Sequence, residues 1–318
     1  MFLEYFKISL GAVLQIFILG LAGFILVKRA ILGHAALDIL SRLVVEVTLP
    51  ALIFTQLIKD FSFSLYPDWW LFPFLSVLIT LLGLSVGYIF ATFIKGPHHK
   101  VQFLSLIAFQ NSGYLPLAII SVILSADKVT TALTYLFLFL LGFNLIIWSF
   151  GVYMLSFHES KKFEFASLFS PPVVAILVSL ILVFFGLNKF IPELILKPLR
   201  MVGDCTLPLA MFVVGGSLTL IKLKHIDKKA IFFVILAKLI ILPSLGLFLV
   251  IKFKLAELLG LLIVLQLAVP PATSLSVISR HYKKEDLLIS QGIFVGHLIA
   301  LITLPIFLSL YFALGMVK

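Results

Sequence analysis

The feature that most constrains this chain is a series of apolar runs that recur along all 318 residues. Most of these runs approach or exceed 18 residues, the length that a helix needs to cross a bilayer. Hydrophobic residues form 62% of the chain and charged residues only 12%, about half the charge that a soluble domain of this size needs. The sequence therefore predicts an all-α, multi-pass membrane protein without a separate soluble domain.

Charged loops divide the chain into ten expected membrane spans. Lys7 precedes the first apolar run, but no small-residue cleavage site follows before Lys28, so we interpret this run as a span and not as a signal peptide. The only cysteine, Cys205, excludes an internal disulfide. The expected spans are 8–27, 36–58, 69–94, 101–124, 131–157, 171–189, 198–221, 229–251, 255–279 and 288–314.

The distribution of Lys and Arg predicts how the spans are oriented. Thirteen of these residues lie in loops that follow odd-numbered spans, and eight lie on the other side, termini included. By the positive-inside rule, the cation-rich loops are cytoplasmic. We therefore expect a cell-membrane protein with both termini outside, and we assign the net charge of +10 to topology and contact with membrane lipids, with no nucleic-acid partner.

The two halves of the chain resemble each other. "SRLVVEVTLPALIF" in the second span aligns with "LRMVGDCTLPLAMF" in the seventh at an offset of 158. "IAFQNSGYLPLA" in the fourth span aligns with "IVLQLAVPPATS" in the ninth at an offset of 156, which matches Gln110 with Gln266. Because each half holds five spans, an odd number, residues 1–162 and 163–318 are expected to form an inverted-topology repeat, an architecture typical of secondary transporters.

Helix-breaking residues interrupt the fourth and ninth spans at similar depths. Gly113 and Pro116 weaken the fourth helix, and Pro270-Pro271 break the ninth. Such interruptions are tolerated where they are buried in protein or line a cavity. Ordinary kinks are the alternative, but two interruptions at corresponding positions favour a binding site at the membrane midplane.

The later part of each broken span would direct its helix N-terminus at this site, where free N–H groups and the helix dipole favour an anion. Nearby hydroxyl and amide groups would add hydrogen bonds. The expected substrate-binding residues are Gln110, Asn111, Ser112, Gly113, Tyr114, Pro116, Gln266, Val269, Pro270, Pro271, Ala272, Thr273 and Ser274.

Three further polar residues lie inside expected spans. Lys238 is about nine residues inside the eighth span, where a charge costs at least about 2.5 kcal/mol. It either faces the protein interior or snorkels to the cytoplasmic surface. Asn144 and His297 are candidates for a proton relay or for hydrogen bonds between helices.

Two acidic residues each follow a basic residue at a spacing of four. Arg42 with Glu46 and Arg200 with Asp204 would share a helix face, so each pair is expected to form either a structural ion pair or part of a functional site. Motifs of soluble enzymes, including HExxH, the P-loop, GxSxG and CxxC, are absent from the sequence. We therefore expect neither catalysis, nor a cofactor, nor a metal site.

Several of these segments resemble the auxin efflux carrier family, which includes plant PIN-type auxin transporters and bacterial permeases for malate and similar acids. The resemblance rests on "TLPALIF", "NSGYLPLA", "LPLAMFVVGGSL" and "AVPPATSLSVISRHYKKEDLLISQGIFVGHLIALITLP". Bacterial members often have Gly-x-Pro after the Asn of the fourth span, whereas here Tyr114-Leu115 leads into Pro116.

The resemblance implies ten helices in a fold shared in outline with bile-acid symporters and sodium–proton antiporters. Spans 1, 2, 6 and 7 would form a scaffold, often dimeric, and spans 3–5 and 8–10 would form a transport domain that moves like an elevator. We therefore expect a homodimeric secondary transporter of a small organic anion such as a carboxylic acid. In this preferred interpretation, Lys238 replaces a bound coupling cation. The alternative is a cation-coupled transporter of the bile-acid-symporter or sodium–proton-antiporter kind.

Overall fold

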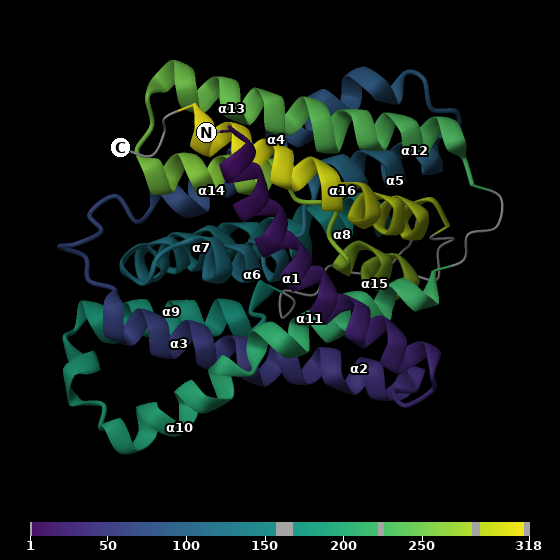
Figure 1. Cartoon of the computed structure of the whole chain (residues 1–318). Coiled ribbons are helices and arrows are strands. Elements are labelled where there is room, and N and C mark those ends of the chain that lie inside the picture. The colour runs from purple at the N-terminus through teal and green to yellow at the C-terminus, as the bar shows by residue number, and fades with distance from the viewer. Residues whose placement is uncertain (1, 157–167, 222–225, 282–286, 315–318) are drawn as a thin grey trace.

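The computed structural model describes residues 2–156, 168–221, 226–281 and 287–314, which form helices joined by short turns (Figure 1). Across these ranges there is no strand, and the only β-type pairing is a single bridge between Gln110 and Pro271. The boundary expected between the two halves, at 162–163, lies outside the described residues. The α-helices are α1 (Phe2–Lys28), α2 (His34–Leu43), α3 (Leu49–Asp60), α4 (Leu71–Ala91), α5 (Pro97–Ala108), α6 (Tyr114–Ile123), α7 (Ala126–Ile146), α8 (Val152–Ser156), α9 (Pro171–Phe184), α10 (Glu193–Asp204), α11 (Thr206–Ser217), α12 (Lys228–Ile235), α13 (Leu242–Phe253), α14 (Glu257–Ala268), α15 (Ser274–His281) and α16 (Leu287–Ala313).

Six helical stretches in the described ranges are long and apolar enough to cross a membrane. Each coincides with one of the expected spans. The remaining expected spans are built from shorter helices, and the ten-span inverted repeat stays a prediction. The six stretches are Phe2–Lys28, Leu71–Ala91, Ala126–Leu155, Glu193–Leu220, Lys228–Phe253 and Leu287–Ala313.

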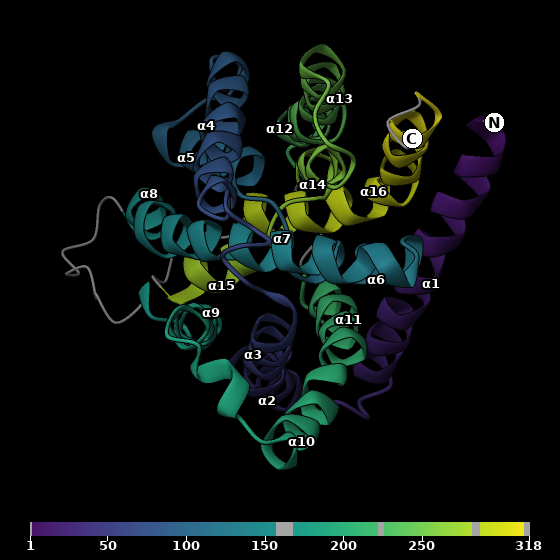
Figure 2. The ribbon, with the colours of Figure 1, turned by 90° about the vertical axis from the view of Figure 1, so that its left-hand side faces the viewer.

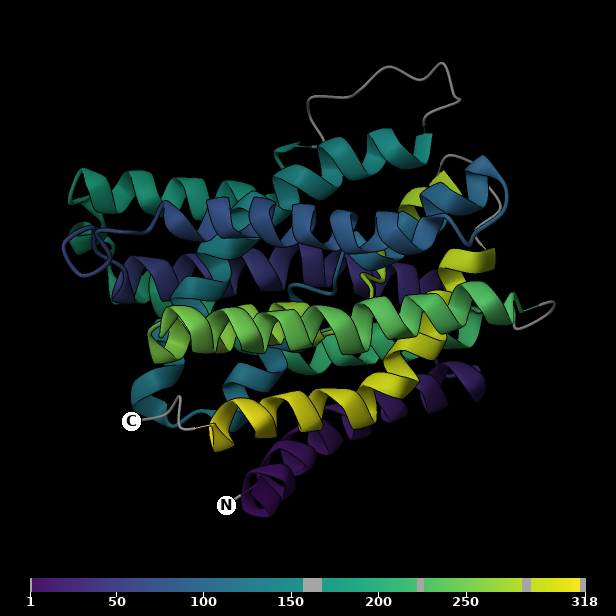
Figure 3. The same ribbon diagram turned by 90° about the horizontal axis from the view of Figure 1, so that it is seen from above.

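The helices form two groups on either side of a central layer. Figure 2 shows α6 and α7 crossing the middle of the molecule, with α4, α5 and α12–α14 above them and α2, α3 and α9–α11 below. The long helix α1 packs against both α11 and α16, and so joins the two groups at one side. Seen from above, in Figure 3, both termini lie toward the same end of the bundle.

Close helix packing holds α4 between α5 and α7. A Cβ atom added to Gly83 of α4 would lie 2.9 Å from the Cα atom of Ala108, the last residue of α5. A Cβ atom added to Gly142 of α7 would overlap the backbone oxygen of Pro73 in α4. Small residues at these positions let the backbones approach, as is common between membrane helices. The end of α5 is thereby fixed in position just before the chain leaves the helix.

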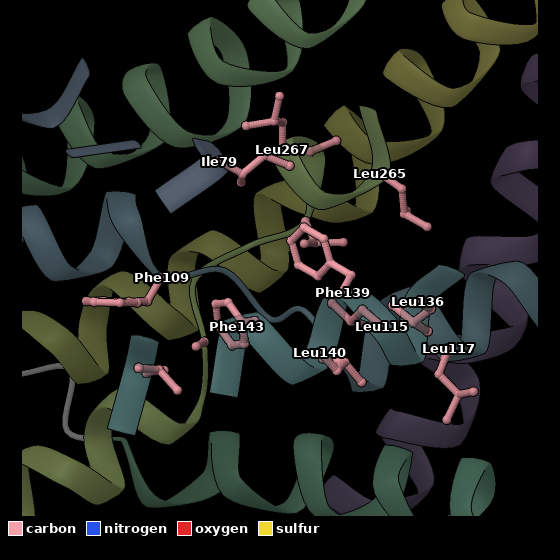
Figure 4. Close-up of a cluster of buried hydrophobic side chains, with 14 of the residues drawn as sticks. Ile79, Phe109, Leu115, Leu117, Leu136, Phe139, Leu140, Phe143, Leu265 and Leu267 are labelled. Carbon is pink, nitrogen blue, oxygen red and sulfur yellow. The ribbon is translucent and has the colours of Figure 1, made fainter. Parts of the chain in front are cut away.

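A buried apolar cluster surrounds this point. Figure 4 shows Phe109 and Phe143 beside the extended segments, with Phe139 and Leu265 nearby. Phe109, Phe139 and Leu265 are fully buried. These side chains surround the interrupted segments with protein instead of lipid, which is the condition for irregular backbone at membrane depth.

Three π-helical turns interrupt the described helices. They are Val44–Thr48 between α2 and α3, Ile147–Gly151 after α7, and Leu236–Ile241 between α12 and α13. π-Turns are rare and frequently occur at functional sites. Here the first two contribute residues to the central cavity and the third contains Lys238.

Candidate functional site

The fourth and ninth expected spans are both broken, and the two breaks contact each other. Between α5 and α6 and between α14 and α15 the chain is extended, and Gln110 faces Pro271 across the single β-bridge. The Asn111 backbone nitrogen donates to the Pro270 oxygen at 2.9 Å, and the Ala272 nitrogen donates to the Phe109 oxygen at 2.9 Å. The breaks therefore satisfy part of each other's backbone hydrogen bonding, which their prolines and non-helical geometry would otherwise leave unpaired.

The structure corrects the sequence alignment of these breaks. α5 ends at Ala108 and α14 at Ala268, while α6 begins at Tyr114 and α15 at Ser274, so the breaks repeat at an offset of 160. The match of Gln110 with Gln266 at an offset of 156 is therefore wrong by one helical turn. Residues four apart lie on the same helix face and therefore have similar surroundings. A sequence alignment that is displaced by four residues can thus still match similar residue types.

A cavity of about 150 Å³ lies beside the crossing. Eight of the expected binding residues line it, together with Asn144. Among the described residues that line it there is no Lys, Arg, His, Asp or Glu, so the polarity of this lining comes from neutral side chains and backbone. The expected residues that line it are Gln110, Asn111, Ser112, Gly113, Tyr114, Ala272, Thr273 and Ser274.

Two helices begin at this cavity. Gly113 is the N-cap of α6, without a side-chain hydrogen bond to the first turn, and Ser274 starts α15. The first N–H groups of a helix lack intrahelical partners and carry a partial positive charge. Pro116 lies in the first turn of α6 and not at the break itself, where its missing N–H removes no helical bond. The cavity thus receives positive potential from two helix N-termini.

Several buried polar atoms at the crossing lack a hydrogen-bond partner. Gln110 is fully buried, yet neither its amide nitrogen nor its amide oxygen is bonded, and the Ser112 hydroxyl is also unpaired. Leaving such groups unsatisfied costs about 1–3 kcal/mol each. Groups of this kind mark a place where a ligand or water completes the bonding.

Asn111 connects the crossing to α16. Its side-chain nitrogen lies 3.4 Å from His297 Nε2, and His297 Nδ1 lies 2.8 Å from the Ile293 backbone oxygen. A carbonyl oxygen only accepts, so Nδ1 carries the proton and Nε2 accepts from Asn111. The structure therefore places His297 behind Asn111, where the neutral ring orients the Asn111 amide.

Gln266 supports the opposite side of the first break. It is fully buried in the last turn of α14, and its side-chain nitrogen donates to the Ser112 backbone oxygen at 3.1 Å. Its side-chain oxygen is unpaired. Val269, Pro270 and Pro271 are also buried but do not line the cavity. Gln266 and these three residues therefore shape the crossing from behind.

Lys238 lies in the third π-turn with 1% of its surface exposed. Its Nζ atom has no hydrogen-bond partner among the described residues and does not reach the surface, so the snorkelling alternative is wrong. The π-turn packs against α5, α14 and α16. Asn144, by contrast, lines the cavity and donates to the Leu140 oxygen at 2.8 Å. The three residues grouped as a possible coupling site therefore occupy different places around the crossing.

One of the two expected ion pairs forms. Arg42 Nε lies 3.0 Å from Glu46 Oε1, with side chains 75% and 47% exposed. In the described part of the chain, no ion pair joins Arg200 to Asp204. Asp204 is the last residue of α10.

The sequence did not identify the wall of the cavity opposite the crossing. Val45 and Leu49 come from the second expected span, Ile147 and Trp148 from the fifth, and Ser170 immediately precedes the sixth. Among the described residues, the Ser170 hydroxyl has no hydrogen-bond partner. The available signal was the short "SPP" stretch at 170–172, whose Ser precedes a proline-started helix.

Comparison with known proteins gives a match along almost the entire chain. The family described as "Membrane transport protein" matches residues 8–308. This range contains the crossing, the cavity and all three π-turns.

Similar proteins come from archaea and plants. An uncharacterized transporter of Methanothermobacter thermautotrophicus is 28% identical over 94% of this chain and 97% of that protein. An uncharacterized transporter of Methanocaldococcus jannaschii is 25% identical over 94% and 97%. Protein PIN-LIKES 1 of Arabidopsis thaliana is 24% identical over 87% of this chain and 72% of that protein.

Proposed function

The chain belongs to the membrane transport protein family of auxin efflux carrier and PIN-like proteins, and from this premise we propose that it is a secondary active transporter of a small organic anion. A carboxylic acid such as malate represents the proposed substrate class. The family is one of membrane transporters. The substrate proposal rests on the cavity at the crossing.

The observation that carries the proposal is the source of positive potential in that cavity. The N-termini of α6 and α15 open onto it, while the described residues that line it include no charged side chain. Unpaired groups of Gln110 and Ser112 and the amide of Asn111 supply hydrogen bonds. Helix N-termini bind carboxylates in this way in transporters with broken helices. A volume of about 150 Å³ suits an acid of a few carbon atoms.

The position of the cavity supports alternating access of the elevator type. Its crossing side and α7 belong to the expected transport domain, whereas Val45, Leu49 and Ser170 belong to the expected scaffold. A ligand held between two such bodies becomes accessible from either side when one body slides against the other. We assign spans 3–5 and 8–10 to the moving part and spans 1, 2, 6 and 7 to the fixed part.

Lys238 is proposed to replace a coupling cation. Its π-turn packs against α5 and α14, whose C-terminal ends carry negative partial charge next to the breaks. The buried ammonium has no acidic partner among the described ion pairs. A fixed positive charge here would compensate both carbonyl ends and make transport independent of sodium.

One observation favours a second candidate, a cation-coupled transporter. The side-chain oxygens of Gln110 and Gln266 are both buried without donors. Amide and carbonyl oxygens are the ligands that sodium prefers in such transporters. In this alternative the cation binds at the crossing, and its positive charge attracts the anionic substrate.

Two pairs of contacts agree with the proposed topology, in which both termini lie outside. Lys95 and Lys229, from two expected cytoplasmic loops, line one cleft. Lys128, from an expected outer loop, and Glu257, at the expected outer end of the ninth span, form an ion pair at 2.6 Å. Segments expected on the same side of the cell membrane thus lie together.

A homodimer is proposed for the scaffold side. Arg42 and Glu46 are exposed on a helical segment inside the second expected span. A charged pair at this position is costly against lipid and is better covered by a second copy. Mass photometry of the protein in detergent would give twice the monomer mass if this proposal holds.

Counterflow in proteoliposomes tests the transport proposal directly. Vesicles loaded with unlabelled malate or another small dicarboxylate should accumulate the same labelled acid, with and without sodium. Accumulation that strictly requires sodium would favour the second candidate. If none of the acids in a panel of mono- and dicarboxylates accumulates, the proposed substrate class is refuted.

A further inference from the structure

A second cleft lies at one end of the bundle, away from the crossing. It has a volume of about 440 Å³ and forms where the turn between α4 and α5 meets the start of α12. None of its residues lines the cavity at the crossing. Its lining consists of Phe93, Ile94, Lys95, Gly96, His99, Asp227 and Lys229.

The cleft is basic. Lys95, His99 and Lys229 are exposed and line it. Asp227 is the only acidic residue in the lining, and its Oδ1 atom already accepts the Ala230 backbone N–H at 3.0 Å as the cap of α12. The cleft therefore holds two lysine charges against one carboxylate that is already hydrogen-bonded. This balance suits an anionic group.

One wall of the cleft is aromatic. Phe93 is 50% exposed, its ring stacks on Phe233 at 5.1 Å between centroids, and Lys229 Nζ lies 5.9 Å from its centroid. Phe232, beside Phe233, is 58% exposed. α4 ends two residues before Phe93, so this wall lies where a membrane span meets the aqueous surface. Basic groups next to exposed apolar rings at this depth match an amphiphile better than a soluble anion.

We propose that this cleft binds the headgroup of an anionic phospholipid, with its phosphate between Lys95 and Lys229 and its acyl chains along Phe93 and Phe232. The shared chemistry is a phosphate, and the apolar wall selects the lipid over free phosphate. Bound lipid would join the α4–α5 turn to α12, two segments more than 120 residues apart in the chain.

The opposite end of the bundle offers a matched control. In the last turn of α13, Lys252 Nζ also lies over aromatic rings, 5.5 Å from the centroid of Phe248 and 5.8 Å from that of Phe253. There the nearby Glu257 is an acidic group paired with Lys128, and Lys252 does not line the basic cleft. A change at Lys252 therefore removes one lysine and its two cation–π contacts without touching the proposed site.

Thermal unfolding of the full chain in neutral detergent tests the proposal. Adding phosphatidylglycerol should raise the unfolding midpoint by about 2–4 °C more than phosphatidylcholine does. The double variant K95Q/K229Q should lose at least half of this difference, while K252Q and K95R/K229R retain it. Native mass spectrometry should show fewer retained phosphatidylglycerol molecules for K95Q/K229Q only.

Three results would overturn the proposal. The first is an equal stabilisation by the two lipids in the wild-type chain. The second is an undiminished phosphatidylglycerol effect in K95Q/K229Q, provided that its midpoint without lipid matches the wild type. The third is a full midpoint rise with millimolar inorganic phosphate alone, which would identify the occupant as a soluble anion.

Discussion

The two broken segments meet at one point but contribute different chemistry to it. The first break, from Phe109 to Gly113, carries amide and hydroxyl side chains, several of which are unpaired. The second, from Val269 to Thr273, carries two prolines, and Pro270 contributes a backbone oxygen to Asn111. From this difference we propose that the first half supplies most of the ligand groups while the second supplies rigid backbone.

The helices that support the breaks are also unequal. At the offset of 158 found in the second and seventh spans, Lys238 of the second half corresponds to Thr80 of the first. Both are buried, but Thr80 donates to the Ser76 oxygen at 2.8 Å, whereas Lys238 Nζ has no hydrogen-bond partner in the part of the chain that the structure describes. In the predicted inverted repeat, the buried charge therefore lies in the second half only, and each prediction below tests one part of this inequality.

The largest effect is expected at Lys238. Lys238→Ala should lower organic-anion transport at least tenfold, equivalent to about 1.4 kcal/mol, because the carbonyl ends of α5 and α14 lose their compensating charge. High sodium should restore part of the activity if the emptied site admits the ion. Uptake into proteoliposomes with and without sodium measures both effects.

Two variants control this experiment. Lys238→Arg should be tolerated poorly, because a planar guanidinium does not fit a site shaped for a compact ammonium. Thr80→Ala, at the corresponding position of the first half, should transport nearly normally. Near-wild-type transport by Lys238→Ala in sodium-free buffer would rule out the proposed role of the charge.

A smaller effect is expected at the first break. Asn111→Ala should weaken substrate binding about fivefold to tenfold, or about 1–1.4 kcal/mol, because it removes one donor while leaving the backbone bond to Pro270 in place. Expression and oligomeric state should not change. Isothermal titration with a substrate identified by counterflow measures the affinity.

Ser121→Ala is the matched control for Asn111. Ser121 lies on α6, outside the cavity, and bonds only to the Leu117 oxygen. This variant should bind substrate normally. If Asn111→Ala also binds normally, Asn111 does not belong to the substrate site, and the assignment of ligand groups to the first half fails.

A still smaller effect on binding is expected at the second break. Pro270→Ala should change the affinity by less than about twofold, because alanine keeps the backbone oxygen that accepts from Asn111. The unfolding midpoint should fall by a few degrees, since the unfolded chain gains freedom worth about 0.4–1 kcal/mol. A larger loss of affinity in Pro270→Ala than in Asn111→Ala would reverse the comparison of the two breaks.

The smallest effect is expected from single-cysteine substitutions that test the orientation of the two halves in the membrane. These substitutions should leave transport unchanged. On a Cys205→Ser background, a cysteine at Lys100 should react with an impermeant thiol reagent only from the cytoplasmic side. A cysteine at Asp127 should react only from outside. The opposite pattern would show that the proposed topology is inverted, with both termini in the cytoplasm.

The sequence by itself determined those features that depend on local composition. Long apolar runs predicted membrane helices, and six of them appear as helices of sufficient length. Gly113 and Pro270-Pro271 predicted the breaks, because these residues weaken a helix wherever they occur. The spacing of four between Arg42 and Glu46 predicted their ion pair, which needs only one helical turn.

The tertiary structure decided which residues meet across the chain. It brought Asn111 to His297, 186 residues later, and shifted the register of the two breaks by one turn. It also buried Lys238, for which the sequence had left snorkelling as an alternative. It also supplied Trp148 and Ser170 to the cavity. Lipid and protein interior are similarly apolar, so composition cannot show which face of a membrane helix contacts protein. Only the packing of the helices separates the residues that line the cavity from those that face lipid.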